Sequence, residues 1–130
     1  MGIIYNFQDI LLIASGAALG ANTRYIIYKK LQKNNISKKI IILVINTFSS
    51  FFLGFFLAIL SENSSLEYSY ELGLFFSIGL LGSLSTFSSF IFDLYDFFEK
   101  FEFYKAFKLF VISLTLGLAS FTVGCVLGML

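Results

Sequence analysis

Histidine and tryptophan are absent from this chain of 130 residues, and cysteine occurs once, as Cys125. Without histidine, the chain lacks the most frequent general base and the most frequent metal ligand of enzymes. A single cysteine leaves no disulfide and no cysteine-based metal site within one chain. We therefore expect that the protein is not an enzyme.

Charged residues are also scarce. They make up 13% of the sequence, against 58% hydrophobic residues, and the mean hydropathy is +0.87. A soluble domain of this size would not stay in solution with that balance. The net charge of +1 provides no basic field for nucleic acid, so no nucleic-acid partner is expected. The composition predicts a membrane protein surrounded by lipid.

Four apolar segments are long enough to cross a membrane. A helix needs roughly 20 residues to span a hydrocarbon core of about 30 Å. The segments lie at about residues 8–28, 40–60, 71–92 and 106–130. They fill the chain, which predicts an all-α membrane protein with a single four-helix transmembrane domain over residues 1–130.

Small residues recur along the first and fourth segments. Gly16 and Gly20 form a GxxxG step in the first. A longer stripe runs down the fourth segment through Ser113, Gly117, Ser120, Gly124 and Gly128. Because helices in lipid associate where small residues let their backbones approach, we interpret both stripes as packing faces.

The positive charges are distributed asymmetrically. All nine basic residues lie at or in the first and third connections: Arg24, Lys29, Lys30, Lys33, Lys38, Lys39, Lys100, Lys105 and Lys108. Four spans place these connections on one side of the membrane, and the other side has Glu62 and Glu67 but no lysine or arginine. The positive-inside rule puts the basic connections in the cytoplasm and both termini outside it.

The third segment carries two glycines and five hydroxyl residues between Gly79 and Ser89. Glycine lowers helix stability, and serine and threonine hydroxyls compete for nearby carbonyls, so a break near the middle is predicted. Unwound backbone at this depth is tolerated only inside protein or beside a water-filled cavity. Freed carbonyls could bind a cation, and the next half-helix would favour an anion. A continuous, flexible packing helix is the alternative.

The second segment has an amide in its interior. Asn46, Ser50 and Gly54 recur every four residues and share one helical face, which must meet protein or water because an amide is costly against lipid. In the third segment, Phe87 and Phe90 share a face as well. Their positively polarised ring edges, with amide and hydroxyl donors, could replace the hydration shell of a small anion. Interhelical packing is the alternative for both, since the chain has 18 phenylalanines.

Three motifs in these segments resemble the CrcB/Fluc family of small fluoride ion channels. Residues 82–90 resemble its G-x-x-(S/T)-T-F-S-(S/T)-F motif, and residues 46–54 its N-x-x-(G/S)-S-x-x-L-G motif. Residues 16–25 are similar to its G-(A/G)-x-x-G-A-x-x-R-Y opening. The motifs occur in order and cover most of the chain. One departure is Leu109, where the family has a tyrosine one turn before Ser113.

The resemblance implies an antiparallel dimer with two narrow pores for fluoride. It assigns ring-edge, amide and hydroxyl contacts along the pore to Phe87 and Phe90, to Asn46, and to Ser88, Ser89 and Ser113.

The resemblance also implies one central Na+ that is structural and not transported. The backbone carbonyls of Gly82 and Ser85 would bind it from each subunit. Arg24 would lie near the cytoplasmic mouth, although an arginine that snorkels at a helix end would look the same in sequence.

The function predicted on this basis is passive export of fluoride across the plasma (inner) membrane. A small proton-coupled multidrug-type transporter and a noncatalytic subunit of a membrane complex are the alternatives. The transporter needs a carboxylate deep in a span. The acidic residues of the spans lie near the predicted ends, where we expect them to be solvated: Asp9, Glu71, Asp93 and Asp96. A packing subunit gives no reason to combine Asn46 with the phenylalanine pair.

The charge bias has a consequence for assembly. An antiparallel homodimer needs one sequence to insert in both orientations, which nine basic residues on one side and none on the other disfavour. We therefore predict a heterodimer with a homologous chain of opposite bias, with a homodimer as the alternative.

Reporter tags on the termini test this orientation. We expect tags at both ends to be accessible only from outside the cytoplasm, because the basic connections stay inside. Equal populations facing the two sides would contradict a fixed orientation.

Overall fold

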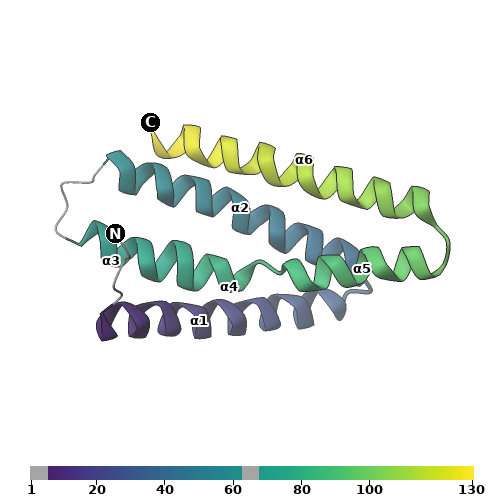
Figure 1. Ribbon diagram of the computed structural model, residues 1–130, viewed down its shortest axis with the longest axis horizontal. Coiled ribbons are helices and arrows are strands. Elements are labelled where there is room, and N and C mark those ends of the chain that lie inside the picture. The colour runs from purple at the N-terminus through teal and green to yellow at the C-terminus, as the bar shows by residue number, and fades with distance from the viewer. Residues whose placement is uncertain (1–5, 63–67) are drawn as a thin grey trace.

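The computed structural model describes residues 6–62 and 68–130, and Glu67 lies outside the described residues. Within them the chain is helical and has no strand (Figure 1). Four stretches of the described residues are long and apolar enough to span a membrane: α1 (Phe7–Gln32), α2 (Lys38–Glu62), the stretch Ser69–Glu99, and α6 (Phe103–Gly128). The predicted all-α fold with four spans is confirmed.

The third span is divided into several pieces. It begins with α3 (Ser69–Leu72), continues as the π-helix η1 (Gly73–Leu81) and the short α4 (Gly82–Leu84), and resumes as α5 (Phe87–Glu99). Ser85 and Thr86, between α4 and α5, have extended backbones, with φ/ψ of −69°/155° and −140°/105°. The predicted break near the middle of this span is confirmed.

The third span continues to Glu99, beyond the end predicted near Phe92. Asp93 therefore lies inside α5 and is only 3% exposed. The charges of Lys38 and Lys39 at the start of α2 act on its carboxylate. Asp9 is 8% exposed and accepts a hydrogen bond from the backbone N–H of Asn6 at 3.0 Å. The expectation that these two carboxylates are solvated was wrong.

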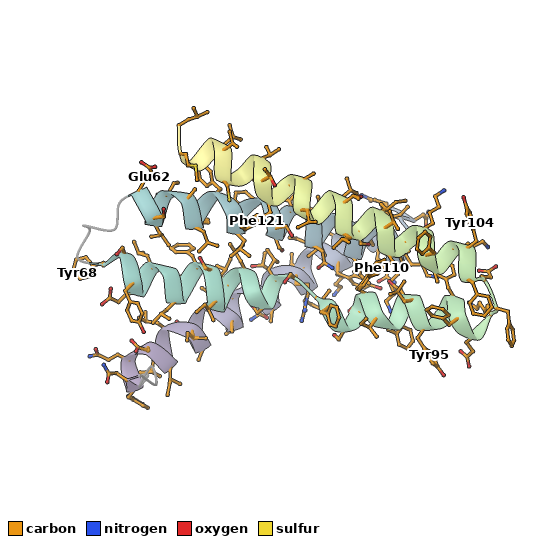
Figure 2. The ribbon with its side chains drawn as sticks, turned by 45° about the horizontal axis from the view of Figure 1, so that its top comes forward. Glu62, Tyr68, Tyr95, Tyr104, Phe110 and Phe121 are labelled. Atoms are coloured by element: carbon orange, nitrogen blue, oxygen red, sulfur yellow. The ribbon has the colours of Figure 1, made fainter. Side chains whose placement is uncertain are left out.

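The connections alternate between the two ends of the bundle. The connections from α1 to α2 and from α5 to α6 lie at one end, and the start of α1 and the end of α6 lie at the other (Figure 1). Tyr95 and Tyr104 lie towards the first end, and Glu62 and Tyr68 at the second (Figure 2). The nine basic residues thus gather towards one end of the molecule.

Glycine residues allow the helices to pack closely in two pairs, α1 with η1 and α2 with α6. A Cβ atom at Gly16 or Gly20 of α1 would collide with the carbonyl oxygens of Phe75 or Leu80 in η1. In α6, a Cβ atom at Gly124 would collide with the carbonyl oxygen of Phe51 in α2. Backbones this close exclude any side chain, so the interpretation of these stripe glycines as packing residues is confirmed.

The packing predicts that Gly124→Ala destabilises the chain while Gly73→Ala does not. At Gly124 the new methyl group meets backbone that cannot move away, which costs about 1–3 kcal/mol. At Gly73 the nearest atom to a new Cβ is a leucine methyl of Leu60 at 3.7 Å, an ordinary contact. Thermal unfolding in detergent measures the difference, and equal midpoints for the two variants would contradict this packing.

Candidate functional site

Asn46 and Thr86 form a reciprocal pair at the helix break. The side-chain oxygen of Asn46 accepts the backbone N–H of Thr86 at 2.8 Å, and its amide nitrogen donates to the Thr86 carbonyl at 3.2 Å. Both backbone groups of Thr86 are therefore satisfied although the helix has ended there. Buried backbone groups need such partners, so the second span supplies what the break in the third removes.

Two further side chains make hydrogen bonds at the break. Arg24 of α1 places Nη1 3.4 Å from the carbonyl oxygen of Ser85. The hydroxyl of Thr86 accepts the backbone N–H of Ser89 at 3.3 Å and so caps the start of α5. N-terminal N–H groups of a helix have no partner within the helix, which is why a threonine at this position stabilises it.

A cavity of about 240 Å³, here called the aromatic cavity, lies between α2, α5 and α6. It brings together four of the six predicted pore residues: Asn46, Phe87, Phe90 and Ser113. The ring centroids of Phe87 and Phe90 are 6.2 Å apart. The described residues that line this cavity include no charged side chain.

Phe110 lines the aromatic cavity, although it is not among the site residues predicted from the sequence. Its ring centroid is 6.5 Å from that of Phe90, and Figure 2 shows it on the side of α6 that faces α5. Phe110 lies three residues before Ser113 and hence on the same helical face, which was the signal available in the sequence. It supplies an aromatic ring although Leu109 replaces the family's tyrosine.

A second cavity of about 320 Å³, here called the basic cavity, contains the other two predicted pore residues. Ser88 and Ser89 line it together with Arg24, Lys38 and Thr86. The structure therefore places the predicted residues in two neighbouring cavities rather than one. Thr86 lines the basic cavity and Asn46 the aromatic cavity, so their hydrogen-bonded pair belongs to both walls.

The break also affects the two carbonyls predicted to hold sodium. In an uninterrupted helix the N–H of Thr86 would bond to the carbonyl of Gly82, but here it donates to Asn46. The Gly82 oxygen instead lies 3.5 Å from the Ser85 hydroxyl. The Ser85 carbonyl has Arg24 beside it, which leaves one of its two lone pairs.

Oxygen ligands of this kind suit a hard cation. No group of three or more His, Cys, Asp or Glu residues in the described part of the chain could hold a metal. A cation at the break would therefore depend on the backbone carbonyls.

An ion-pair network fixes the far end of α5 to the start of α2. Asp96 lies 2.9 Å from the Nζ of Lys39 and 2.8 Å from that of Lys100. Lys39 also sits 3.3 Å from the ring centroid of Phe97. The hydrogen bond with Asp96 raises the pKa of Lys100, which lies just beyond the span, so this lysine remains charged. The network holds the half-helix that carries Phe87 and Phe90 in place.

Four membrane-spanning stretches among the described residues, a broken third span, and one basic and one aromatic cavity that meet at the break are the features of a small ion channel. Residues 11–125 match the family described as CrcB-like protein, Camphor Resistance (CrcB). A protein of Prochlorococcus marinus (strain NATL2A) named fluoride-specific ion channel FluC 2 is 51% identical over 121 residues, which cover 93% of this chain and 98% of that protein. The chain belongs to the CrcB family.

The capping role of Thr86 predicts that Thr86→Val lowers thermal stability and Thr86→Ser does not. Valine keeps the shape but removes the hydroxyl that accepts the N–H of Ser89, at a cost of about 1 kcal/mol. Serine retains the acceptor. Unfolding midpoints in detergent check this, and a valine variant as stable as the serine variant would show that the cap contributes nothing.

Proposed function

We propose that this chain is one subunit of a channel that exports fluoride passively from the cytoplasm across the plasma (inner) membrane. The observation that carries the proposal is the aromatic cavity, where an amide, three phenylalanine rings and two serines converge beside a broken helix. The name of the Prochlorococcus relative, a fluoride-specific ion channel, supports the choice of ion. No catalytic activity is part of the proposal.

The lining of the aromatic cavity suits a small, strongly hydrated anion. Leaving water requires donors at close range, and the amide of Asn46 and the hydroxyls of Ser50 and Ser113 provide them. The positive edges of Phe87 and Phe90 add weak attraction. Because none of the described residues that line this cavity is a lysine or arginine, an anion would be bound without being trapped by a full charge.

The basic cavity would act before the aromatic cavity. Arg24 and Lys38 raise the local concentration of anions, as clefts lined by one sign of charge do. The hydroxyls of Ser88 and Ser89 would then provide polar steps towards the break. Fluoride would enter from the cytoplasm at this basic end and pass the Asn46–Thr86 pair.

We further propose a structural Na+ at the carbonyls of Gly82 and Ser85, bound jointly by two subunits and not transported. The support is the Gly82 carbonyl, which has no helical donor because the N–H of Thr86 donates to Asn46 instead. A bound sodium ion would be attracted to the negative oxygen ends of the carbonyl groups at the break.

The proposed channel needs a second subunit in the opposite orientation. Phe87 is 74% exposed in the single chain, so one side of the aromatic cavity has no wall of its own. An antiparallel partner would supply that wall. The one-sided basic residues favour a homologous chain of opposite bias, a heterodimer, over a second copy of this chain.

The structure does not favour a proton-coupled transporter, although Asp93 is buried. Such a transporter must expose its carboxylate to both substrate and protons. Asp93 lines neither cavity, and Lys38 and Lys39 already act on its charge.

Efflux from liposomes tests the function. Proteoliposomes containing the chain, with the subunit that copurifies with it, are loaded with fluoride and followed with a fluoride electrode, and chloride efflux is measured alongside. We expect fluoride to leave and chloride to be retained. Failure of every such preparation to release fluoride would contradict the channel.

The matched pair Phe90→Leu and Phe107→Leu tests the aromatic cavity in this assay. Phe90→Leu keeps an apolar side chain but removes the ring edges, a loss of about 1–1.5 kcal/mol, so we expect fluoride efflux to fall about tenfold. Phe107 is exposed on the same helix as Phe110 and lies outside the aromatic cavity, so its variant should conduct normally. Equal efflux from both variants would show that the ring of Phe90 does not contribute to the pore.

A further inference from the structure

The pairing of Asn46 with Thr86 fixes which way round the side-chain amide of Asn46 lies. A backbone N–H can only donate and a backbone carbonyl can only accept. Since Thr86 presents both to the same amide, at 2.8 Å and 3.2 Å, Oδ1 must face the N–H and Nδ2 must face the carbonyl. Rotating the amide by 180° would lose both hydrogen bonds and bring two oxygens together. An isolated asparagine has no such preference.

In this orientation, the group of the Asn46 amide that has no partner in Thr86 is an N–H, which is a hydrogen-bond donor. The oxygen of Asn46 is engaged with Thr86, and one of the two amide hydrogens is engaged with the carbonyl. The second hydrogen on Nδ2 remains, and Asn46 lines the aromatic cavity. The amide therefore offers positive polarity to that cavity.

We propose that the main chain of Thr86 is a positioning element that locks Asn46 as a hydrogen-bond donor towards an anion, and so contributes to the preference of the pore for anions over cations. The inference rests on the proposed function. It explains why the break and the asparagine occur together, because an unbroken helix would engage the N–H of Thr86 and leave the amide free to turn.

Nuclear magnetic resonance of the asparagine side chains tests the orientation. The protein, purified with its copurifying subunit, is labelled with ¹⁵N at asparagine and titrated with sodium fluoride, and sodium chloride serves as the control. We expect two well-separated proton signals from Asn46, of which fluoride shifts one and leaves the other unchanged. Asn22, whose amide donates to the Ala18 carbonyl at 2.8 Å on an exposed face, should not respond.

The outcomes separate this inference from the proposed function. Equal shifts of both Asn46 protons, or no shift in a preparation that releases fluoride from liposomes, would overturn the inference and leave the channel intact. A preparation that releases no fluoride and shows no shift would overturn both.

The variant Asn46→Asp distinguishes a hydrogen-bond donor to the anion from a residue that only stabilises the fold through the backbone of Thr86. When protonated, the introduced carboxylic acid can still accept from the N–H of Thr86 and donate to its carbonyl, but it has no second hydrogen for the cavity. We expect mild acidification, at a pH where fluoride is still ionised, to restore thermal stability but not fluoride efflux, which should stay at least tenfold below the unmodified chain. Empty liposomes provide the blank.

Asn22→Asp is the matched control, since it makes the same chemical change away from both cavities. It should conduct like the unmodified chain at both pH values. Recovery of efflux together with stability in Asn46→Asp would show that the pair serves only the fold, and would overturn the inference.

Discussion

The structure depends on one constraint, that peptide groups inside a membrane must find hydrogen-bond partners within the protein. An α-helix meets it automatically, but the third span stops being helical at Ser85 and Thr86. The missing partners come from other spans: Asn46 of α2 satisfies Thr86, and Arg24 of α1 approaches the Ser85 carbonyl. Hydrogen bonds thus join three spans at Ser85 and Thr86, and the candidate site lies around these two residues.

The same break divides the polar interior into two environments with different physical roles. The basic cavity has full charges, which attract anions over distance but would hold a dehydrated ion too strongly. The described residues that line the aromatic cavity have only partial charges, which can replace hydration and still release the ion. The Asn46–Thr86 pair joins their walls. Along the proposed route, anions would therefore be attracted at the basic cavity and would lose their hydration shell at the aromatic cavity.

Rigid surroundings keep this arrangement in position. Glycine contacts hold α1, which carries Arg24, against η1 of the third span, and hold α2, which carries Asn46, against α6. Asp96 and Lys39 fix α5 to α2 at the basic end. One side remains open in the single chain, as the exposure of Phe87 shows, and we propose that a second subunit completes the pore on that side.

The sequence by itself determined the four spans, the break and the gathering of basic residues at one end, because these follow from local composition, periodicity and side-chain chemistry. It also indicated Asn46, Phe87, Phe90 and Ser113, which the structure brings together. Only the tertiary structure decided that Asn46 pairs with the backbone of Thr86, that Ser88 and Ser89 line a different cavity, and that Asp93 is buried. Each of these depends on which helical faces meet, and the glycine contacts and ion pairs that set those faces join residues far apart in the chain.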